Sequence, residues 1–200
     1  DELVKYIFPK LRTLCESRGV SLNEVELRWG ITDEEVAEGK ALLICLDEID
    51  RSRPFFLCML GERYGWTPES IPENLLESYP WLSAMQGRSI TELEIQYGAL
   101  LRQEKDMHAY FYFRDSGFNQ RLPEGSNLAD YEAESAENAV KLQVLKQKIR
   151  ESGFPLAENY QTPREFGELV LRDFTELMNH LYPENAIPTE FEIEDQEQIV

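Results

Sequence analysis

The sequence has 200 residues, of which 42% are hydrophobic, and a formal net charge of −18. This length suits one domain with an apolar core, and the charge excludes nucleic acid and anionic membrane surfaces as general partners because phosphates would be repelled. No apolar run approaches the roughly 18 residues of a membrane span. Cys15, Cys45 and Cys58 lie among apolar residues and indicate reduced thiols, so we expect a cytoplasmic protein.

The first quarter of the chain predicts a helix, a strand and a second helix. Residues 1–18 carry apolar residues at helical spacing. Residues 20–27 alternate between apolar and polar side chains, with a slip at Asn23, and this alternation predicts a strand. Thr32, followed by Glu35 three residues later, forms a capping-box pattern that begins the second helix.

A run of six apolar residues at 55–60 is the centre of the predicted sheet. It is bounded by proline and glycine and is too short for a helix, so it predicts a strand buried on both faces. Arg63, Tyr64 and Trp66 follow it directly. These side chains would lie at the carboxyl edge of the sheet, where open α/β sheets bind ligands.

A proline-rich segment separates this strand from the next helix. Residues 67–88 predict a long loop with room for one short helical turn, and the loop is either a binding loop or a plain insertion. Ser89 and Glu92 form a second capping-box pattern, and the helix that follows is predicted to end near residue 102. Residues 108–113 then predict a strand that ends at Arg114.

The last third of the chain continues the alternation of helices and strands. We predict a helix over residues 133–150 with Val140 on its buried stripe, together with Val144 or Leu145, and Ile149. A short edge strand is expected at residues 156–160, and Thr162-Pro163-Arg164-Glu165 begins a helix that ends at Leu181. The fold class is therefore α/β with a doubly wound parallel sheet over residues 1–182, followed by an acidic linker over residues 183–200.

Several chemistries are excluded by the motifs. No P-loop, no GxGxxG and no GxSxG sequence is present. His108 and His180 have no cysteine or histidine at metal-ligand spacing, so we expect no metal site.

Three arginines follow the predicted strands within three residues, namely Arg28, Arg63 and Arg114. In a parallel sheet they would converge on one edge, where guanidinium groups bind carboxylate or phosphate. Trp29, Tyr64 and Trp66 stand beside them, so we expect this edge to stack a base or nicotinamide. The alternative is that each arginine pairs with a nearby acid; the candidates are Glu26, Glu62 and Asp115.

Glu94 is the candidate catalytic carboxylate. Glu92 has an explanation as the capping partner of Ser89, whereas Glu94 lies beside the apolar stripe of its helix. A half-buried carboxylate near cations stabilises an oxocarbenium ion or binds a ribose. The alternative is a solvated glutamate on the flank of the helix.

The order of these motifs resembles TIR domains, in which a helix and a serine precede an apolar strand, a tyrosine follows it, and the next helix carries a glutamate. The matching residues here are Ser52, Tyr64 and Glu94. Four segments are similar more specifically to a TIR-like family that precedes NACHT-type NTPase modules in telomerase-protein-component-like, nephrocystin-like and NACHT–WD-repeat proteins, and that occurs in bacterial defence proteins. These segments are residues 27–32, 60–66, 89–94 and 113–115.

The resemblance implies a flavodoxin-like, TIR-like fold and a signalling role through self-association or contact with other domains of the parent protein. Family members begin with a strand and a Ser-Ser-Thr-Phe-Arg-Asp segment, so we expect the sheet to lack its first strand in this chain. We expect the apolar residues of segments 29–32 and 67–88 to form the interaction surface.

The resemblance also implies an alternative, because in some TIR domains a glutamate in the helix after the third strand cleaves NAD. Glu94 matches that position and Glu92 is its rival. No cofactor is required in this case, since NAD would be the substrate. A third hypothesis is nucleotide binding without turnover.

Overall fold

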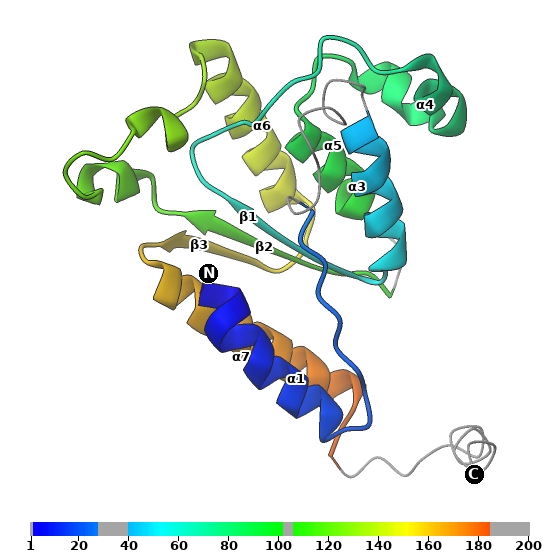
Figure 1. Cartoon of the computed structure of the whole chain (residues 1–200), viewed down its shortest axis with the longest axis vertical. Coiled ribbons are helices and arrows are strands. Elements are labelled where there is room, and N and C mark those ends of the chain that lie inside the picture. Colours follow the sequence, from blue (N-terminus) through cyan, green and yellow to red (C-terminus); the bar gives the residue numbers. More distant parts are fainter. Residues whose placement is uncertain (1, 28–39, 102–105, 185–200) are drawn as a thin grey trace. The chain divides into compact units, whose positions relative to one another are not determined.

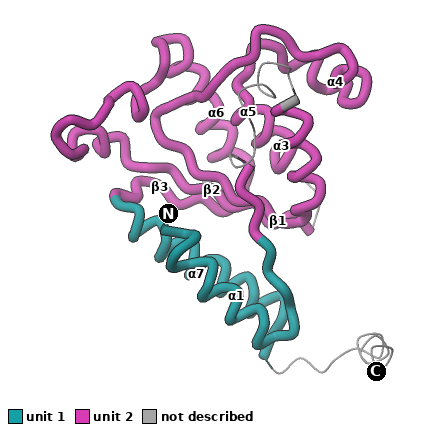
Figure 2. Tube along the Cα trace, in the orientation of Figure 1, with its two compact units in different colours: residues 1–23, 162–200 teal, residues 24–161 magenta. Residues whose placement is uncertain are grey.

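The computed structural model describes residues 2–27, 40–101 and 106–184. The chain divides into two compact units, which Figure 2 shows in different colours. One unit joins residues 1–23 to residues 162–200, and the other comprises residues 24–161. The candidate sites below all lie in the second unit.

The first unit is a pair of helices from the two ends of the chain. A π-helical turn at Leu3–Ile7 leads into α1 (Phe8–Glu16), which packs against α7 (Pro163–Leu181). The Thr162 hydroxyl accepts a hydrogen bond from the Glu165 backbone, which confirms the predicted start of α7.

A three-stranded parallel sheet forms the centre of the second unit (Figure 1). The strands are β1 (Phe55–Leu60), β2 (His108–Arg114) and β3 (Leu156–Tyr160), in the order β1-β2-β3. Both strand pairs are parallel, with Phe56 opposite Ala109 and Phe111 opposite Leu156. The predictions of an α/β class and of parallel strands at 55–60 and 108–113 are therefore confirmed.

Helices cover the sheet through an apolar core. α5 (Ile90–Ile95) continues into a π-helical segment at Gln96–Leu100, and α6 (Ala136–Glu151) follows β2. Their buried side chains pack against those of β1 and β2 in one cluster, which includes Leu60, Phe111, Phe113, Ile95, Ala99, Leu142, Leu145 and Ile149. Gly98 permits the close approach, because a Cβ there would lie 2.5 Å from the Phe56 ring.

A second apolar cluster corrects the interpretation of residues 67–88. This segment contains α4 (Glu73–Ser78) and a 3₁₀ helix at Pro80–Met85. Leu75 and Leu82 are buried against α3 (Lys40–Arg51), so the segment is neither a bare loop nor an exposed apolar surface. Its apolar residues are instead part of the protein's own core.

The predicted strand at residues 20–27 is wrong. None of these residues pairs with a strand of the sheet among the described parts of the chain. Its alternation slips at Asn23, and Val25 is 47% exposed, so the segment offers no continuous apolar face to a sheet. The other predicted interaction segment, residues 29–32, lies outside the described residues, as does nearly all of the predicted linker at 183–200.

Candidate functional site

Tyr64 is the buried centre of the carboxyl edge after β1. It is 1% exposed, and its hydroxyl donates a hydrogen bond of 2.5 Å to Oε2 of Glu92. The same hydroxyl accepts from the Ser89 backbone at 3.3 Å, while the Glu92 backbone donates to the Ser89 hydroxyl. Ser89 therefore caps α5 as predicted, but the Glu92 carboxylate reaches Tyr64.

The Glu92 carboxylate is buried beside cations. Its side chain is 1% exposed, Nη1 of Arg88 lies 3.5 Å from Oε2, and Nζ of Lys148 lies 3.8 Å from Oε1. Oε1 has no hydrogen-bond partner among the described residues. Burial, followed by the hydrogen bond to Glu92, raises the pKa of Tyr64, so the tyrosine remains protonated and a donor at neutral pH.

Glu94, the predicted catalytic residue, has different neighbours. Glu94 is half-buried, and its negative charge affects the thiol groups of Cys45 in α3 and Cys58 in β1. Burial is the main cause that raises the pKa of both thiols, and the negative charge of Glu94 raises it further. This arrangement keeps the thiols protonated and makes them poor nucleophiles.

Arg63 binds a carboxylate from a distant part of the chain. Its Nε donates to Oε1 of Glu134 at 3.1 Å, and the backbone N–H of Gly65 donates to the same oxygen at 3.1 Å. The backbone N–H of Tyr64 donates to Oε2 at 3.3 Å. The partner of Arg63 is thus Glu134, which the sequence did not suggest, and not the adjacent Glu62.

Arg114 lies at the end of β2 in an aromatic setting. Its guanidinium carbon is 4.4 Å from the centre of the Phe118 ring and 5.4 Å from that of Tyr131. It also lies against Gly61, where a Cβ would approach Nη2 to 2.5 Å. Among the described residues Nε of Arg114 has no hydrogen-bond partner.

Two sets of contacts therefore attach residues 116–135 to the carboxyl edge of the sheet. Phe118 and Tyr131 hold Arg114, and Glu134 holds the segment after β1. Arg63 and Tyr64 follow β1 and Arg114 ends β2, so these side chains come from the ends of neighbouring strands. Arg28 and Trp29 lie outside the described residues.

Trp66 stands at a shallow surface site and not in a ligand cavity. Trp66 is 50% exposed, and its backbone carbonyl accepts a hydrogen bond from the Ile90 backbone N–H at 3.0 Å. The hollow beside it, also lined by Ile71 and Pro72, has a volume of about 10 Å³. This is room for about one water molecule.

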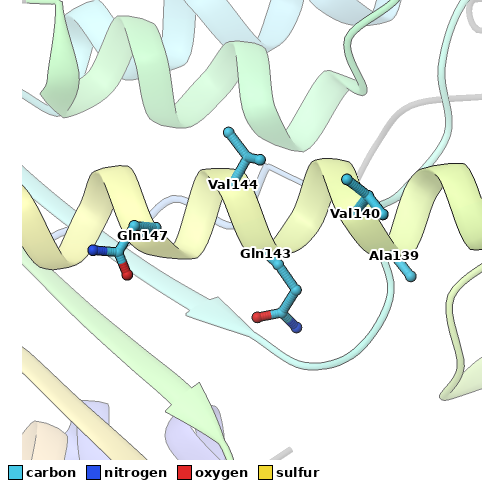
Figure 3. A pocket seen from close by; sticks show the side chains of 5 residues that line it. All are labelled: Ala139, Val140, Gln143, Val144 and Gln147. Carbon is cyan, nitrogen blue, oxygen red and sulfur yellow. The ribbon is translucent and has the colours of Figure 1, made fainter.

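The outer face of α6 carries an apolar stripe that includes Val140, which the sequence predicted to be buried. Val140 is 64% exposed and Val144 is 46% exposed, whereas Leu142, Leu145 and Ile149 are buried. The prediction that Val140 is buried is wrong, because the helix turns its 142–145–149 stripe to the core. Figure 3 shows the outer residues, which line an open hollow of about 420 Å³: Ala139, Val140, Gln143, Val144 and Gln147.

Within residues 2–27, 40–101 and 106–184, no group of histidine, cysteine and acidic side chains is arranged to hold a metal ion. None of the helices in these ranges has the length and apolar character needed to cross a membrane.

The chain is similar to a small part of several long proteins. It is 31% identical to telomerase protein component 1 of Rattus norvegicus, over 91% of this chain and 8% of that protein. It is 32% identical to tetratricopeptide repeat protein 41 of Rattus norvegicus, over 94% of this chain and 17% of that protein. The NACHT domain- and WD repeat-containing protein 1 of Mus musculus matches 70% of this chain at 25% identity, over 9% of its own length.

The chain therefore spans only 8% to 17% of the length of these two relatives. No solved structure gives a significant match. The model of one protein family matches residues 10–175, which is most of the chain. The chain belongs to that family, whose description is "Domain of unknown function (DUF4062)".

Proposed function

We propose that this chain is a TIR-like interaction module of a multidomain NACHT-type (STAND) NTPase protein and that it signals by association. The short share of each relative that it covers supports a role as one module among several. The name of one relative includes a NACHT domain and WD repeats. The parallel order of β1, β2 and β3 with covering helices is compatible with a flavodoxin-like arrangement.

The observation that carries this proposal is the outer stripe of α6. Val140 and Val144 stand one turn apart on the solvent side of a helix whose other side is already in the core. These two exposed valines form a small apolar surface that a partner can cover.

The occupant that fits this stripe best is α6 of a second copy. In line with this stripe, α6 carries Glu137 in its first turn, three residues before Val140, and Lys148 in its last turn, four residues after Val144. Two such helices packed antiparallel place the acidic end of each beside the basic end of the other, in a two-fold symmetric contact. A stable interface buries roughly 1,600 Å², and one helix pair supplies only part of this area, so the association is weak and depends on concentration.

Sedimentation equilibrium tests this proposal. The Val140→Asp/Val144→Asp double variant is expected to remain monomeric at concentrations where the unaltered chain associates, because the charges remove the apolar contact. Leu128→Asp is the control, since Leu128 is 49% exposed but belongs to the 3₁₀ turn Leu128–Asp130 and not to α6. An unaltered chain that stays monomeric up to about millimolar concentration would contradict the second copy as the occupant.

Cleavage of NAD is the second candidate function. The buried pair of Tyr64 and Glu92 favours the hypothesis that the carboxyl edge of the sheet is catalytic. The bond between nicotinamide and ribose breaks through a cationic state that a nearby carboxylate stabilises. Glu94 holds the position implied by the resemblance, whereas Glu92 has the more buried carboxylate, beside Arg88, Lys148 and Tyr64.

Nicotinamide release from NAD separates the two glutamates. If Glu94 is the catalytic residue, Glu94→Gln lowers the rate on the order of a hundredfold, as removal of one preorganised group does, and Glu92→Gln retains turnover in the folded fraction. The reverse result assigns the role to Glu92. No release from the chain joined to its parent NTPase module would leave only the association proposal.

A further inference from the structure

The segment after β1 has the geometry of an anion-binding loop. Three donors, Nε of Arg63 and the backbone N–H groups of Tyr64 and Gly65, converge on one carboxylate at 3.1 to 3.3 Å. Successive backbone N–H groups that point to one place form a concave site for anions, and a guanidinium adds a charged donor. The bound group is the side chain of Glu134.

The backbone of this loop is shaped for that purpose at Gly65. Its φ is +98°, a conformation that side chains other than glycine rarely adopt. A Cβ at Gly65 would also lie 3.0 Å from the Thr91 hydroxyl. The glycine thus allows consecutive N–H groups to face the two oxygen atoms of one carboxylate.

Hydrogen bonding keeps the Glu134 carboxylate charged. Partial burial acts to raise its pKa, but hydrogen bonds from its own backbone, from Gly65, from Arg63 and from Tyr64 outweigh burial and lower the pKa. The loop therefore prefers an anion over a neutral group in this position.

The Glu134 carboxylate occupies the loop at a position that an anion from the solvent can reach. Its side chain is 27% exposed, and it stands at the end of the 116–135 segment, directly before the N-cap Ser135 of α6. One further cation, Lys141, is paired with Glu137 and lies 5.9 Å from the centre of the Tyr64 ring. A phosphate offers more charge and more acceptor oxygens to these donors than a carboxylate does.

We infer that the loop at residues 63–65 is a binding site for the phosphate or diphosphate group of a small soluble molecule, and that Glu134 fills this site until such an anion displaces it. A tethered carboxylate competes at an effective concentration of the order of millimolar. Free phosphate therefore binds weakly to the unaltered chain, and removal of Glu134 exposes the site. This inference does not depend on association through α6.

Titration with inorganic pyrophosphate at pH 7.5, followed by ¹H–¹⁵N NMR, tests the inference. Glu134→Ala is expected to bind pyrophosphate at least about tenfold more tightly than the unaltered chain, because the competing carboxylate is gone. The amide signals of Tyr64 and Gly65 should shift and saturate together. Adding Arg63→Gln to this variant should abolish the gain.

Glu132→Ala is the matched control, since it removes one charge from the same exposed segment without touching the loop. Glu134→Gln provides a second version that keeps the size of the side chain, and the spectra themselves report whether each variant is folded. Unshifted Tyr64 and Gly65 amides in both Glu134 variants, or equal tightening in the Glu132 control, would overturn the inference. Because sedimentation is the readout for α6, the two proposals fail separately.

Discussion

Glu92 and Glu94 lie two residues apart on α5, yet they occupy opposite environments. Glu92 is buried, bonded to the Tyr64 hydroxyl and set beside two cations. Glu94 is half-buried and faces the thiols of Cys45 and Cys58. A helix turns by about 100° per residue, so residues i and i+2 point to nearly opposite sides. One glutamate thus reaches the carboxyl edge of the sheet, and the other lies between α3 and β1.

The largest expected effect of this difference is on stability. Glu92→Ala leaves Arg88 and Lys148 without their buried partner and the Tyr64 hydroxyl without its acceptor. Because Arg88 and Lys148 are partly exposed, the main cost is the buried hydroxyl that loses its partner, about 1 to 3 kcal/mol. Glu94→Ala should cost about 1 kcal/mol or less, as for most sites that are not fully buried.

Urea unfolding of the two variants measures this comparison. A shift of the midpoint without a change in slope reports a change in the free energy of unfolding. Equal destabilisation by the two substitutions would show that the burial of Glu92 does not distinguish the pair. In that case the hydrogen bond between Tyr64 and Glu92 adds no stability beyond that of a half-buried glutamate.

The second expected effect is on thiol chemistry and is confined to Glu94. Because the charge of Glu94 raises the pKa of Cys45, Glu94→Gln should lower that pKa and increase the fraction of thiolate at a given pH. The alkylation rate of Cys45 should therefore rise in the Gln variant, although it stays slow because burial is the larger cause of the shift.

Site-resolved mass spectrometry after iodoacetamide treatment measures the rate at Cys45 between about pH 7 and pH 9, near the usual thiol pKa. Glu92→Gln serves as the control, since the two thiols respond to Glu94. Equal acceleration in both variants would indicate a general opening of the protein. It would not support a local charge effect.

The sequence predicted the parallel strands because their signal is local. Residues 55–60 and 108–113 are apolar, aromatic runs that are too short for a helix, and these local properties favour a buried strand. Thr162 and Ser89 were found for the same reason, since each accepts a hydrogen bond from a residue three positions later.

The errors concern features that depend on distant residues. Val140 and Val144 have helical spacing, but the side that faces the core depends on where α6 meets β1 and β2. The link between Glu92 and Tyr64 spans 28 residues, and that between Glu134 and Arg63 spans 71. No periodicity reports such contacts, so the sequence suggested neither the bond between Tyr64 and Glu92 nor the role of Glu134.

The smallest expected effect concerns Glu134 and extends the comparison to a third carboxylate. Its folded-state pKa is lowered, so its hydrogen bonds stabilise the protein above the unfolded-state pKa of about 4.3. This contribution is lost as the pH falls through the lower folded-state value, because the carboxyl group then binds a proton. Glu134→Gln should therefore lower the melting temperature slightly at pH 7 and have less effect near pH 3. Thermal unfolding of the two proteins across this range measures the difference, with Glu137→Gln as a control that removes an exposed charge paired with Lys141. A difference between Glu134→Gln and the unaltered chain that grows on acidification would contradict the lowered pKa and, with it, the preference of the loop for a charged group.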